Sequence, residues 1–385
     1  MKTMKKITLF LTVIIIFPLY YTCRDNNLLA ENTINVDLTK KKEILLSDLF
    51  DSVRYVRLET TDDVLIKNIS SIRYANNCLY ILDVSTKTLF SFDANTGKNL
   101  WKIQSIGQGP KEYLEPTDFC IDEKNNRLYL FCNMEKILEY DLSGNFIQEY
   151  NVRLKGVSIA CGGDYLYIYV GNHPQWINNR WGESHFLTVY NKHDGLLKGL
   201  LPFDFNIKIG GTRIQQWPNA FYHYNDEMYF FSPYFYDIYS VKGNGVEIVH
   251  RFNFGKQNSQ RHLITYSTEE LRRTNYARGL HLCWENDMYL SVNTVSAGMF
   301  YHILYVKKES QLFVGDFYND MDYCFPCYLG FVQATNDFVF GHVSAINLLK
   351  QCIQSEGKAS TLKEKIKAEI TEDDNPVIFF YYFKK

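Results

Sequence analysis

The 385-residue chain lacks several features that would mark particular classes of protein. Its formal net charge is −2 and it has no long basic tract, which argues against nucleic acid as a partner. Neither the GxxxxGKS/T nor the GxGxxG spacing of a phosphate-binding loop is present. There is also no HExxH motif, and no Ser/His/Asp arrangement that the sequence alone supports. These absences give catalysis no support, and we expect neither a cofactor nor a bound metal.

Proline is scarce, and the body of the chain has no long apolar run. Only 9 residues are Pro, whereas Tyr and Phe number 29 and 27, and aromatic residues make up 16% of the chain. Aromatic side chains favour the half-buried surfaces of β-sheets, so the composition predicts a β-rich fold. After residue 22, no run approaches the ~20 apolar residues that a membrane-spanning helix needs.

The N-terminus has the three zones of an export signal. Three lysines within the first six residues precede an apolar run of 13 residues at 7–19, and polar sequence begins directly after Cys23. The run has the length of a signal-peptide core rather than of a membrane span. Cys23 resembles the lipidated cysteine of a bacterial lipobox, although Tyr-Tyr-Thr at 20–22 departs from the usual pattern.

We therefore predict a signal peptide at 1–22, lipidation of Cys23 and a lipid-anchored linker at 23–45. Two or three acyl chains would hold the protein firmly on a membrane, because one chain alone binds only marginally. The expected location is the cell envelope, on the outer membrane, with its periplasmic or surface side left open. The alternative is an ordinary cleaved signal peptide followed by an incidental cysteine.

A short strand signature recurs six times along the chain. It reads Leu-Tyr-Ile or a close variant, and is centred on Tyr80, Tyr129, Tyr167, Tyr229, Tyr289 and, in a weaker form, Val339. Successive copies are 49, 38, 62, 60 and 50 residues apart, and propeller blades repeat every ~40–50 residues where they carry no insertion. A polar turn precedes each copy, and other short strands flank it. The pattern predicts an all-β, six-bladed β-propeller of four-stranded antiparallel blades over residues 46–385.

The two ends of this region are predicted to close the ring. The alternating run at 53–59 precedes the first repeat, and the final strand-like run at 376–383 has no strand after it. Pairing of 53–59 with 377–383 in blade six would remove an exposed sheet edge. A helical pattern at about 342–374 predicts an insertion in blade six, which either caps the channel mouth or packs against the blade.

Three segments carry a resemblance to a known family. They are Leu-Ser-Asp-Leu-Phe at 46–50, Gly-Gln-Gly-Pro-Lys-Glu-Tyr at 107–113 and Asp-Asn-Pro-Val-Ile at 374–378. With these segments the chain resembles the six-bladed β-propeller lipoproteins of Bacteroides-type bacteria, relatives of NHL-repeat and TolB-like propellers. Lys111 departs from the family pattern, which often has Gly there. The resemblance implies the propeller fold and a binding role at the cell surface or in the periplasm, and it implies no established chemistry.

The longest insertions are predicted to share one face of the propeller. Links between blades and B–C loops, which join the second and third strands of a blade, open on the side opposite the A–B and C–D turns. The insertions at 107–113, 171–185, 208–219, 255–279 and 341–374 all belong to that side. Because loops on a rigid scaffold often carry function, we predict the ligand site on this face, over the mouth of the central channel.

The candidate ligand-binding residues lie in these insertions. They are Gln108, Lys111, Trp176, Arg180, Trp181, Arg213 and Trp217. Aromatic rings combined with guanidinium and amide donors suit a sugar or a peptide, which offer apolar faces and polar edges. The alternative is that the Trp side chains fill the core of their own loop.

Eight cysteines remain after Cys23. A scaffold that depends on disulfides is normally shorter and richer in Cys. Cys324 and Cys327 have CxxC spacing, but a redox pair of this type normally opens a helix in a thioredoxin-like βαβ unit. Core positions or a local disulfide are therefore favoured over a redox or metal site.

Three functional hypotheses follow. The first is a cell-envelope binding or scaffold protein that holds a glycan, a peptide or a partner protein. The second is a hydrolase, lyase or lactonase that acts at the channel mouth, and the third is a purely structural module. Convergent carboxylates or a metal in the channel would favour the enzyme.

Overall fold

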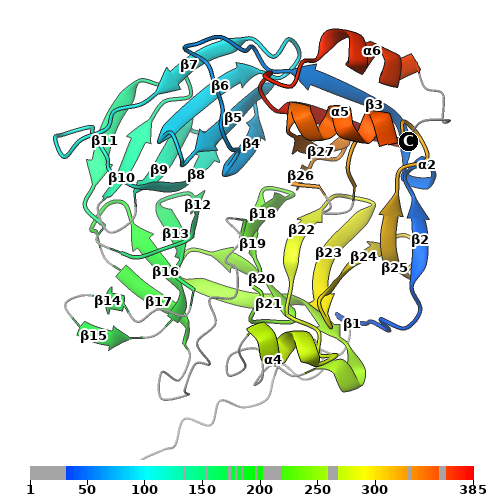
Figure 1. Cartoon of the computed structure of the whole chain (residues 1–385). Helices are drawn as coiled ribbons and strands as arrows, with labels where there is room; N and C mark the ends of the chain where they lie inside the picture. The colour runs from blue at the N-terminus through cyan, green and yellow to red at the C-terminus, as the bar shows by residue number, and fades with distance from the viewer. Residues whose placement is uncertain are drawn as a thin grey trace, which may run out of the picture.

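The strands of the protein form a ring of six sheets (Figure 1). The computed structural model describes residues 32–132, 136–152, 154–171, 175–177, 180–183, 185–195, 197–202, 219–258, 268–327, 331–354 and 361–385. Each sheet contains four antiparallel strands in the order of a propeller blade. The predicted six-bladed β-propeller is therefore confirmed.

Each blade is described by its four strands, from the innermost to the outermost. Blade one contains β4 (Ser71–Ala75), β5 (Cys78–Asp83), β6 (Thr88–Asp93) and β7 (Asn99–Ile103). Blade two contains β8 (Pro116–Asp122), β9 (Arg127–Cys132), β10 (Lys136–Tyr140) and β11 (Phe146–Tyr150). Blade three contains β12 (Ser158–Gly162), β13 (Tyr165–Tyr169), β16 (His185–Asn191) and β17 (Leu197–Pro202).

The second half of the ring follows the same order. Blade four contains β18 (Phe221–Tyr224), β19 (Glu227–Phe230), β20 (Asp237–Lys242) and β21 (Gly245–Asn253). Blade five contains β22 (His281–Glu285), β23 (Tyr289–Ser296), β24 (Met299–Val306) and β25 (Gln311–Tyr318). Blade six contains β26 (Gln333–Ala334), β27 (Phe338–Val343), β28 (Val377–Phe383) and β3 (Phe50–Arg57).

The repeated Leu-Tyr signature forms the second strand of the blades. Tyr80, Tyr129 and Tyr167 lie on β5, β9 and β13, and all three are buried. The polar pair before each signature makes the A–B turn, and Asn76 and Asn77 adopt φ angles of 48° and 61° there. Asn tolerates this left-handed conformation, which a two-residue hairpin turn requires.

The hydrophobic core is divided among the contacts between blades. Buried side chains form a cluster at each of the six blade–blade boundaries of the described chain. Ile81 and Phe380, for example, belong to the cluster between blades one and six. The strands of a blade carry apolar side chains on both faces, so each blade is stabilised by packing against its two neighbours. Closure of the ring removes the apolar surface of every blade from water.

Blade six closes the ring as predicted. β3 pairs antiparallel with β28, with Arg57 opposite Val377 and Arg54 opposite Phe380. The guanidinium carbon of Arg54 also lies 4.5 Å from the centroid of the Phe380 ring. The outermost strand of the last blade therefore comes from the start of the propeller, about 320 residues away in sequence from its partner.

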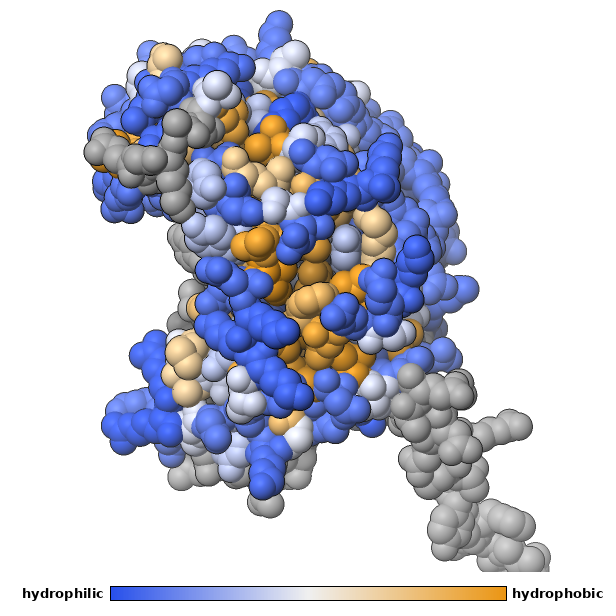
Figure 2. Space-filling model, turned by 90° about the vertical axis from the view of Figure 1, so that its right-hand side faces the viewer, coloured by the Kyte–Doolittle hydropathy of each residue, from blue (hydrophilic) through white to orange (hydrophobic). Residues whose placement is uncertain are grey.

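Two strands lie inside the stretch that we expected to be a linker. β1 (Thr33–Asn35) pairs parallel with β21, and β2 (Lys42–Leu45) pairs parallel with β25, so blades four and five each have a fifth strand. β2 approaches β25 so closely that a Cβ at Gly315 would lie 1.5 Å from the Lys42 carbonyl oxygen. Figure 2 shows the flank on which β2 lies in Figure 1, where hydrophobic residues form a band between hydrophilic margins.

The insertion in blade six contains two helices, α5 (Ala345–Gln354) and α6 (Thr361–Glu369). Leu348 and Ile366 are fully buried in the cluster that β28 shares with blade five. The helices therefore pack against blade six, and none of their residues lines the central cavity described below. Within the described ranges, no helix is long and apolar enough to cross a membrane.

The remaining elements lie in the connections. Blade three carries the hairpin β14 (Gln175–Ile177) and β15 (Arg180–Glu183) between its second and third strands. The link between blades four and five contains the 3-10 helix η1 (Gly255–Gln257) and α4 (Thr268–Arg273). A single turn, α2 (Leu46–Leu49), leads from β2 into β3.

Candidate functional site

A cavity of about 710 Å³ lies at the centre of the ring. Its wall consists of the inner strands of all six blades, and its rim is formed by A–B turns. Exposed side chains at this rim are those of Asn76, Asn77, Glu123, Lys124, Asn125, Asn225 and Asp226. Since A–B turns and interblade links lie at opposite ends of the strands, the cavity opens away from the long insertions. Its volume lies within the range of ~300–1,000 Å³ that is usual for ligand pockets.

Asp118 lies on β8 outside the cavity lining, towards the ends of the inner strands that are farther from this rim. Its carboxylate accepts hydrogen bonds from the Ser71 hydroxyl at 2.6 Å and from the Ser158 hydroxyl at 2.7 Å. Arg73 donates to the same carboxylate at 3.3 Å, and the Ile159 amide donates at 3.0 Å. Asp118 is fully buried. One carboxylate thus joins the inner strands of blades one, two and three.

Arg73 and His223 contribute basic groups to the cavity wall. The Arg73 guanidinium is fixed by Asp118 and by the Ile72 carbonyl oxygen, which accepts a hydrogen bond at 2.9 Å. His223 lies on β18, and its side chain is exposed to the cavity although the ring of inner strands encloses it. This enclosure, together with the positive charge of Arg73, lowers the pKa of His223. The imidazole is therefore neutral near pH 7 and can donate or accept a hydrogen bond.

Glu285 supplies a buried carboxylate where blades four and five meet. The Tyr222 hydroxyl donates to one of its oxygens at 2.8 Å, and the Lys307 ammonium lies 2.7 Å from the other. His250 Nε2 lies 3.7 Å from that second oxygen. Burial raises the pKa of Glu285, but the hydrogen bonds from His250 and Lys307 outweigh burial and bring the pKa below its ordinary value. The carboxylate is held as an anion by its neighbours.

The lining combines aromatic rings with amide groups. Tyr74, Phe221 and Tyr224 lie on inner strands and are half-buried, so part of each ring faces the cavity. The Lys307 ammonium lies 3.9 Å from the centroid of the Tyr224 ring, which fixes that ring from behind. The side-chain amide of Gln333 pairs with the backbone of Tyr74 through bonds of 3.1 and 3.4 Å.

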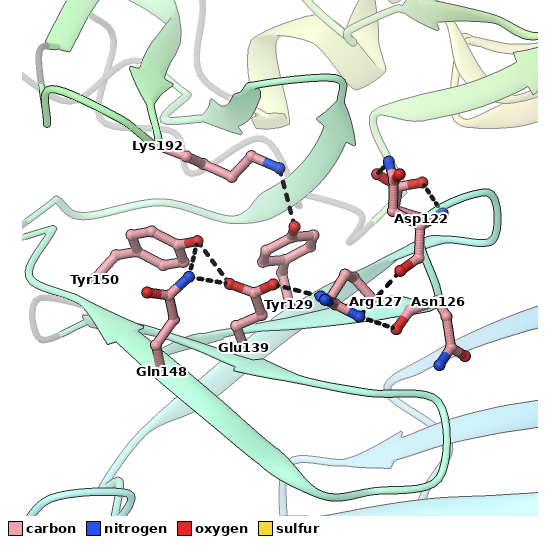
Figure 3. A network of polar contacts seen from close by, with 9 residues as sticks. Asp122, Asn126, Arg127, Tyr129, Glu139, Gln148, Tyr150 and Lys192 are labelled. Carbon is pink, nitrogen blue, oxygen red and sulfur yellow. Dashed lines mark hydrogen bonds and ion pairs between the residues drawn. The ribbon is translucent and has the colours of Figure 1, made fainter.

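A second polar network lies outside the cavity, between blades two and three (Figure 3). The buried Glu139 carboxylate is 2.9 Å from Arg127 Nε and accepts hydrogen bonds from Gln148 at 2.7 Å and Tyr150 at 2.6 Å. The Lys192 ammonium donates to the hydroxyl of a neighbouring tyrosine at 2.9 Å. These residues satisfy one another, so the network joins the two blades and leaves no group directed at a ligand.

Of the residues predicted to bind ligand, Gln108 and Lys111 do not line the cavity, and the role of all seven stays a prediction. Gln108 is exposed on the link between β7 and β8. The Lys111 ammonium lies 5.1 Å from the centroid of the Phe146 ring on β11, at the periphery of the ring. Trp176, Arg180 and Trp181 lie on β14 and β15, with Trp176 opposite Trp181 in the register, and their side chains lie outside the described part. Arg213 and Trp217 fall entirely outside the described residues.

Sequence reasoning missed the cavity rim because its residues look like ordinary hairpin residues. Asn76 and Asn225 each follow an inner strand and adopt φ angles of 48° and 49°. Their positions in the repeats could have predicted the rim. Each of these residues precedes a Leu-Tyr signature or its variant, so the propeller brings both to the same end of the channel.

The described cysteines take core positions. Cys120 and Cys161 lie on neighbouring inner strands, and burial raises the pKa of the Cys120 thiol. Cys324 and Cys327 of the CxxC segment are also buried. Among the described residues, no group of three or more His, Cys, Asp or Glu side chains is arranged to hold a metal ion.

The fold and the cavity define a six-bladed β-propeller with a ligand-sized chamber on its axis. The chain belongs to the DUF4934 family, a domain of unknown function, which it matches over residues 31–382. No curated protein matches the chain.

Two solved structures from Bacteroides share the architecture. A Bacteroides fragilis protein classed as exported is 18% identical, with a TM-score of 0.71, and the match covers 92% of this chain and 99% of that one. A DUF4221 family member from Bacteroides vulgatus is 10% identical, with a TM-score of 0.52 and coverage of 87% and 97%. At these identities the likeness concerns the fold. It agrees with the expected resemblance to Bacteroides-type propellers, whereas the relation to NHL-repeat proteins and the lipid anchor stay predictions.

Proposed function

We propose that this protein is an exported binding protein of the cell envelope, anchored through a lipid on Cys23, whose central cavity holds an oligosaccharide. The observation that carries the proposal is the chemistry of the cavity, where amides form much of the rim and half-exposed aromatic rings form part of the wall. The cavity is large enough for two or three sugar rings and is open at one end.

A sugar matches this lining better than an apolar or a highly charged ligand does. Its hydroxyl groups exchange hydrogen bonds with amides such as those of Asn76 and Asn225, and its C–H faces pack on rings such as Tyr74 and Phe221. The charged groups in the wall are already engaged, since Arg73 is bound to Asp118 and Lys307 to Glu285. They therefore fix the shape of the cavity wall, and Lys124 and Asp226 at the rim are paired with each other.

Export is supported by the apolar run at 7–19 followed by Cys23. The B. fragilis protein classed as exported agrees with this location. The loop-rich face that carries Trp176 and Trp181 stays a second place where the same glycan, a peptide or a partner protein could bind. The hydrolase, lyase or lactonase alternative stays untested.

The proposal is tested by glycan-array screening of the purified protein, followed by calorimetry with any glycan that binds. His223→Trp should narrow the cavity and weaken binding without lowering stability. Asn76→Gly and Asn225→Gly should weaken binding while keeping the turns, because Gly accepts the same positive φ. Asn126→Gly is the matched control, since Asn126 has a φ of 55° in an A–B turn but does not line the cavity.

The loop-rich face makes a different set of predictions. If it holds the ligand, Trp176→Ala or Trp181→Ala should weaken binding by ~2 kcal/mol, and His223→Trp should have no effect. The absence of binding to any glycan would overturn the proposed ligand class. Binding that is as strong in His223→Trp as in the wild type would overturn the proposed site.

A further inference from the structure

Two cysteines from different elements meet in the core beneath the helical insertion of blade six. The Sγ atoms of Cys324 and Cys352 lie 3.1 Å apart. Cys324 belongs to the connection that follows β25 of blade five, and Cys352 lies on α5. We propose that these two thiols form a disulfide in the exported protein, which joins the interblade connection to the insertion. The inference rests on the proposed export, because thiols stay reduced in the cytosol and disulfides persist in the oxidising envelope.

Cys324 is held in place by the buried carboxylate of Asp322. The backbone amides of Cys324 and Phe325 donate to one oxygen of this carboxylate at 2.8 and 2.9 Å. The Tyr381 hydroxyl on β28 donates to the other oxygen. The Phe325 ring then stacks on Phe379, with centroids 5.0 Å apart. The connection is thus fixed to blade six on both sides of Cys324.

Cys352 is placed by the buried face of α5. Ala345, Leu348 and Cys352 follow at spacings of three and four residues, so they share one side of the helix, and all three are buried. Ile366 of α6 is buried in the same cluster. The packing of the insertion therefore directs the Cys352 sulfur towards Cys324. Its contact with Cys324 and the nearby Lys363 and Lys367 ammonium groups outweigh burial and lower the pKa of the Cys352 thiol.

The CxxC spacing suggests a different pair, which the geometry does not favour. The thiol of Cys327 donates to the Phe317 carbonyl oxygen on β25, with the two atoms 3.1 Å apart. Cys327 is therefore directed at blade five, whereas Cys324 is directed at the insertion. The geometry points to pairing across 28 residues of sequence rather than within the motif.

The reaction is a thiol–disulfide exchange with an external disulfide, such as that of an envelope oxidoreductase. The Cys352 thiolate attacks one sulfur of this disulfide, forming a mixed disulfide and releasing the first carrier thiolate. The Cys324 sulfur, having lost its proton, then attacks the Cys352 sulfur and releases the second carrier thiolate. Two protons and two electrons pass from the cysteines to the carrier, which becomes a dithiol. Because both sulfurs are buried in the folded chain, the exchange accompanies the docking of the insertion.

The cross-link would reduce the conformational entropy of the unfolded chain and thereby stabilise the folded protein. It closes a loop of nearly thirty residues, for which chain entropy predicts a rise in melting temperature of about 5 °C in a protein of this size. It would also hold the insertion on the blade that closes the ring.

The pairing is tested on purified protein equilibrated with oxidised and reduced glutathione, so the outcome does not depend on export or on ligand binding. After denaturation and alkylation, trypsin leaves Cys324 and Cys327 on one peptide, residues 309–350, and Cys352 on another, residues 351–358. Mass spectrometry should find these peptides linked, and the link should persist in Cys327→Ser and disappear in Cys324→Ser. Dithiothreitol should lower the melting temperature of the wild type by about 5 °C and leave that of Cys352→Ala unchanged.

A link that disappears in Cys327→Ser would overturn the assignment, as would recovery of both peptides separately alkylated from the wild-type protein. The peptide map of the native chain decides the matter even if a variant fails to fold. A linked wild-type protein that is never exported in cells would support the pairing and contradict the proposed location.

Discussion

The ammonium group of Lys124 lies 2.8 Å from a carboxylate oxygen of Asp226, which joins the A–B turns of blades two and four at the cavity mouth. These blades are not neighbours, and the turn of blade three between them begins with Gly162 and Gly163, which have no side chains. Both charged side chains are largely exposed. The pair therefore limits access to the cavity while contributing little to folding.

Neutralising this pair should change ligand binding more than stability. Lys124→Ala is expected to alter the free energy of unfolding by less than about 1 kcal/mol, because exposed ion pairs contribute little. The association rate of a cavity ligand should rise, as measured by stopped-flow fluorescence. The double variant Lys124→Asp with Asp226→Lys restores the pair and should return the rate to that of the wild type. An unchanged rate in Lys124→Ala would show that the pair does not limit entry.

Removing the carboxylate that joins three blades should destabilise the ring. Asp118→Ala leaves Arg73 without its ion-pair partner and removes the acceptor of two serine hydroxyls, so we expect a loss of about 3–5 kcal/mol. Urea unfolding followed by circular dichroism measures this loss. Asp63→Ala is the control, since the Asp63 side chain is 94% exposed and its variant should stay within about 0.5 kcal/mol. Equal losses in the two variants would contradict the role given to Asp118.

A buried histidine should make stability depend on pH. Burial lowers the pKa of His281 to about 4, whereas an unfolded chain has the ordinary value of about 6.5. The unfolded state therefore binds a proton that the folded state does not, and stability falls as the pH decreases from about 6.5 to 4. The expected contribution of His281 is about 3 kcal/mol over this window, and His281→Gln should remove that share from the urea-unfolding curves. The share of His342, whose pKa burial also lowers to about 4, should remain. His193→Gln, at an exposed histidine, is the matched control variant.

The lipid anchor is tested by Cys23→Ser. The wild-type protein should be recovered with membranes, and the variant should appear in the soluble envelope fraction, because it lacks the thiol that would be acylated. Metabolic labelling with a fatty acid analogue should mark the wild type alone. A variant that stays with the membranes as the wild type does would rule out anchoring through this cysteine.

The blades could be predicted from the sequence because their information is local and repeated. Tyr80 and Tyr129 are each the third residue of a strand that follows a tight turn, and the turn chemistry and alternation are visible without a structure. The partner of β28 could also be predicted, since Val377 has no later strand to pair with and Arg57 precedes the first blade. In a closed ring, few other strands are available to pair with the exposed edge of β28.

The binding surface and the core contacts could not be predicted in the same way. Asn76 and Asn225 are about 150 residues apart, and only the curvature of the ring brings them to one cavity mouth. The approach of Cys324 to Cys352 depends on how α5 packs, which side-chain volumes in three dimensions decide. β1 is too short to be recognised, because it is stabilised by the edge of β21 rather than by its own alternation.

The parallel strand β1 also determines how the proposed lipoprotein would stand on its membrane. Asn32, the first described residue, accepts a hydrogen bond from the amide of Arg251 on the outer edge of blade four. The nine residues that follow Cys23 up to this point can extend at most about 30 Å. The tether would therefore keep the rim of the disc at blade four within about 30 Å of the lipid, so blade four is the part of the ring that would stay near the membrane.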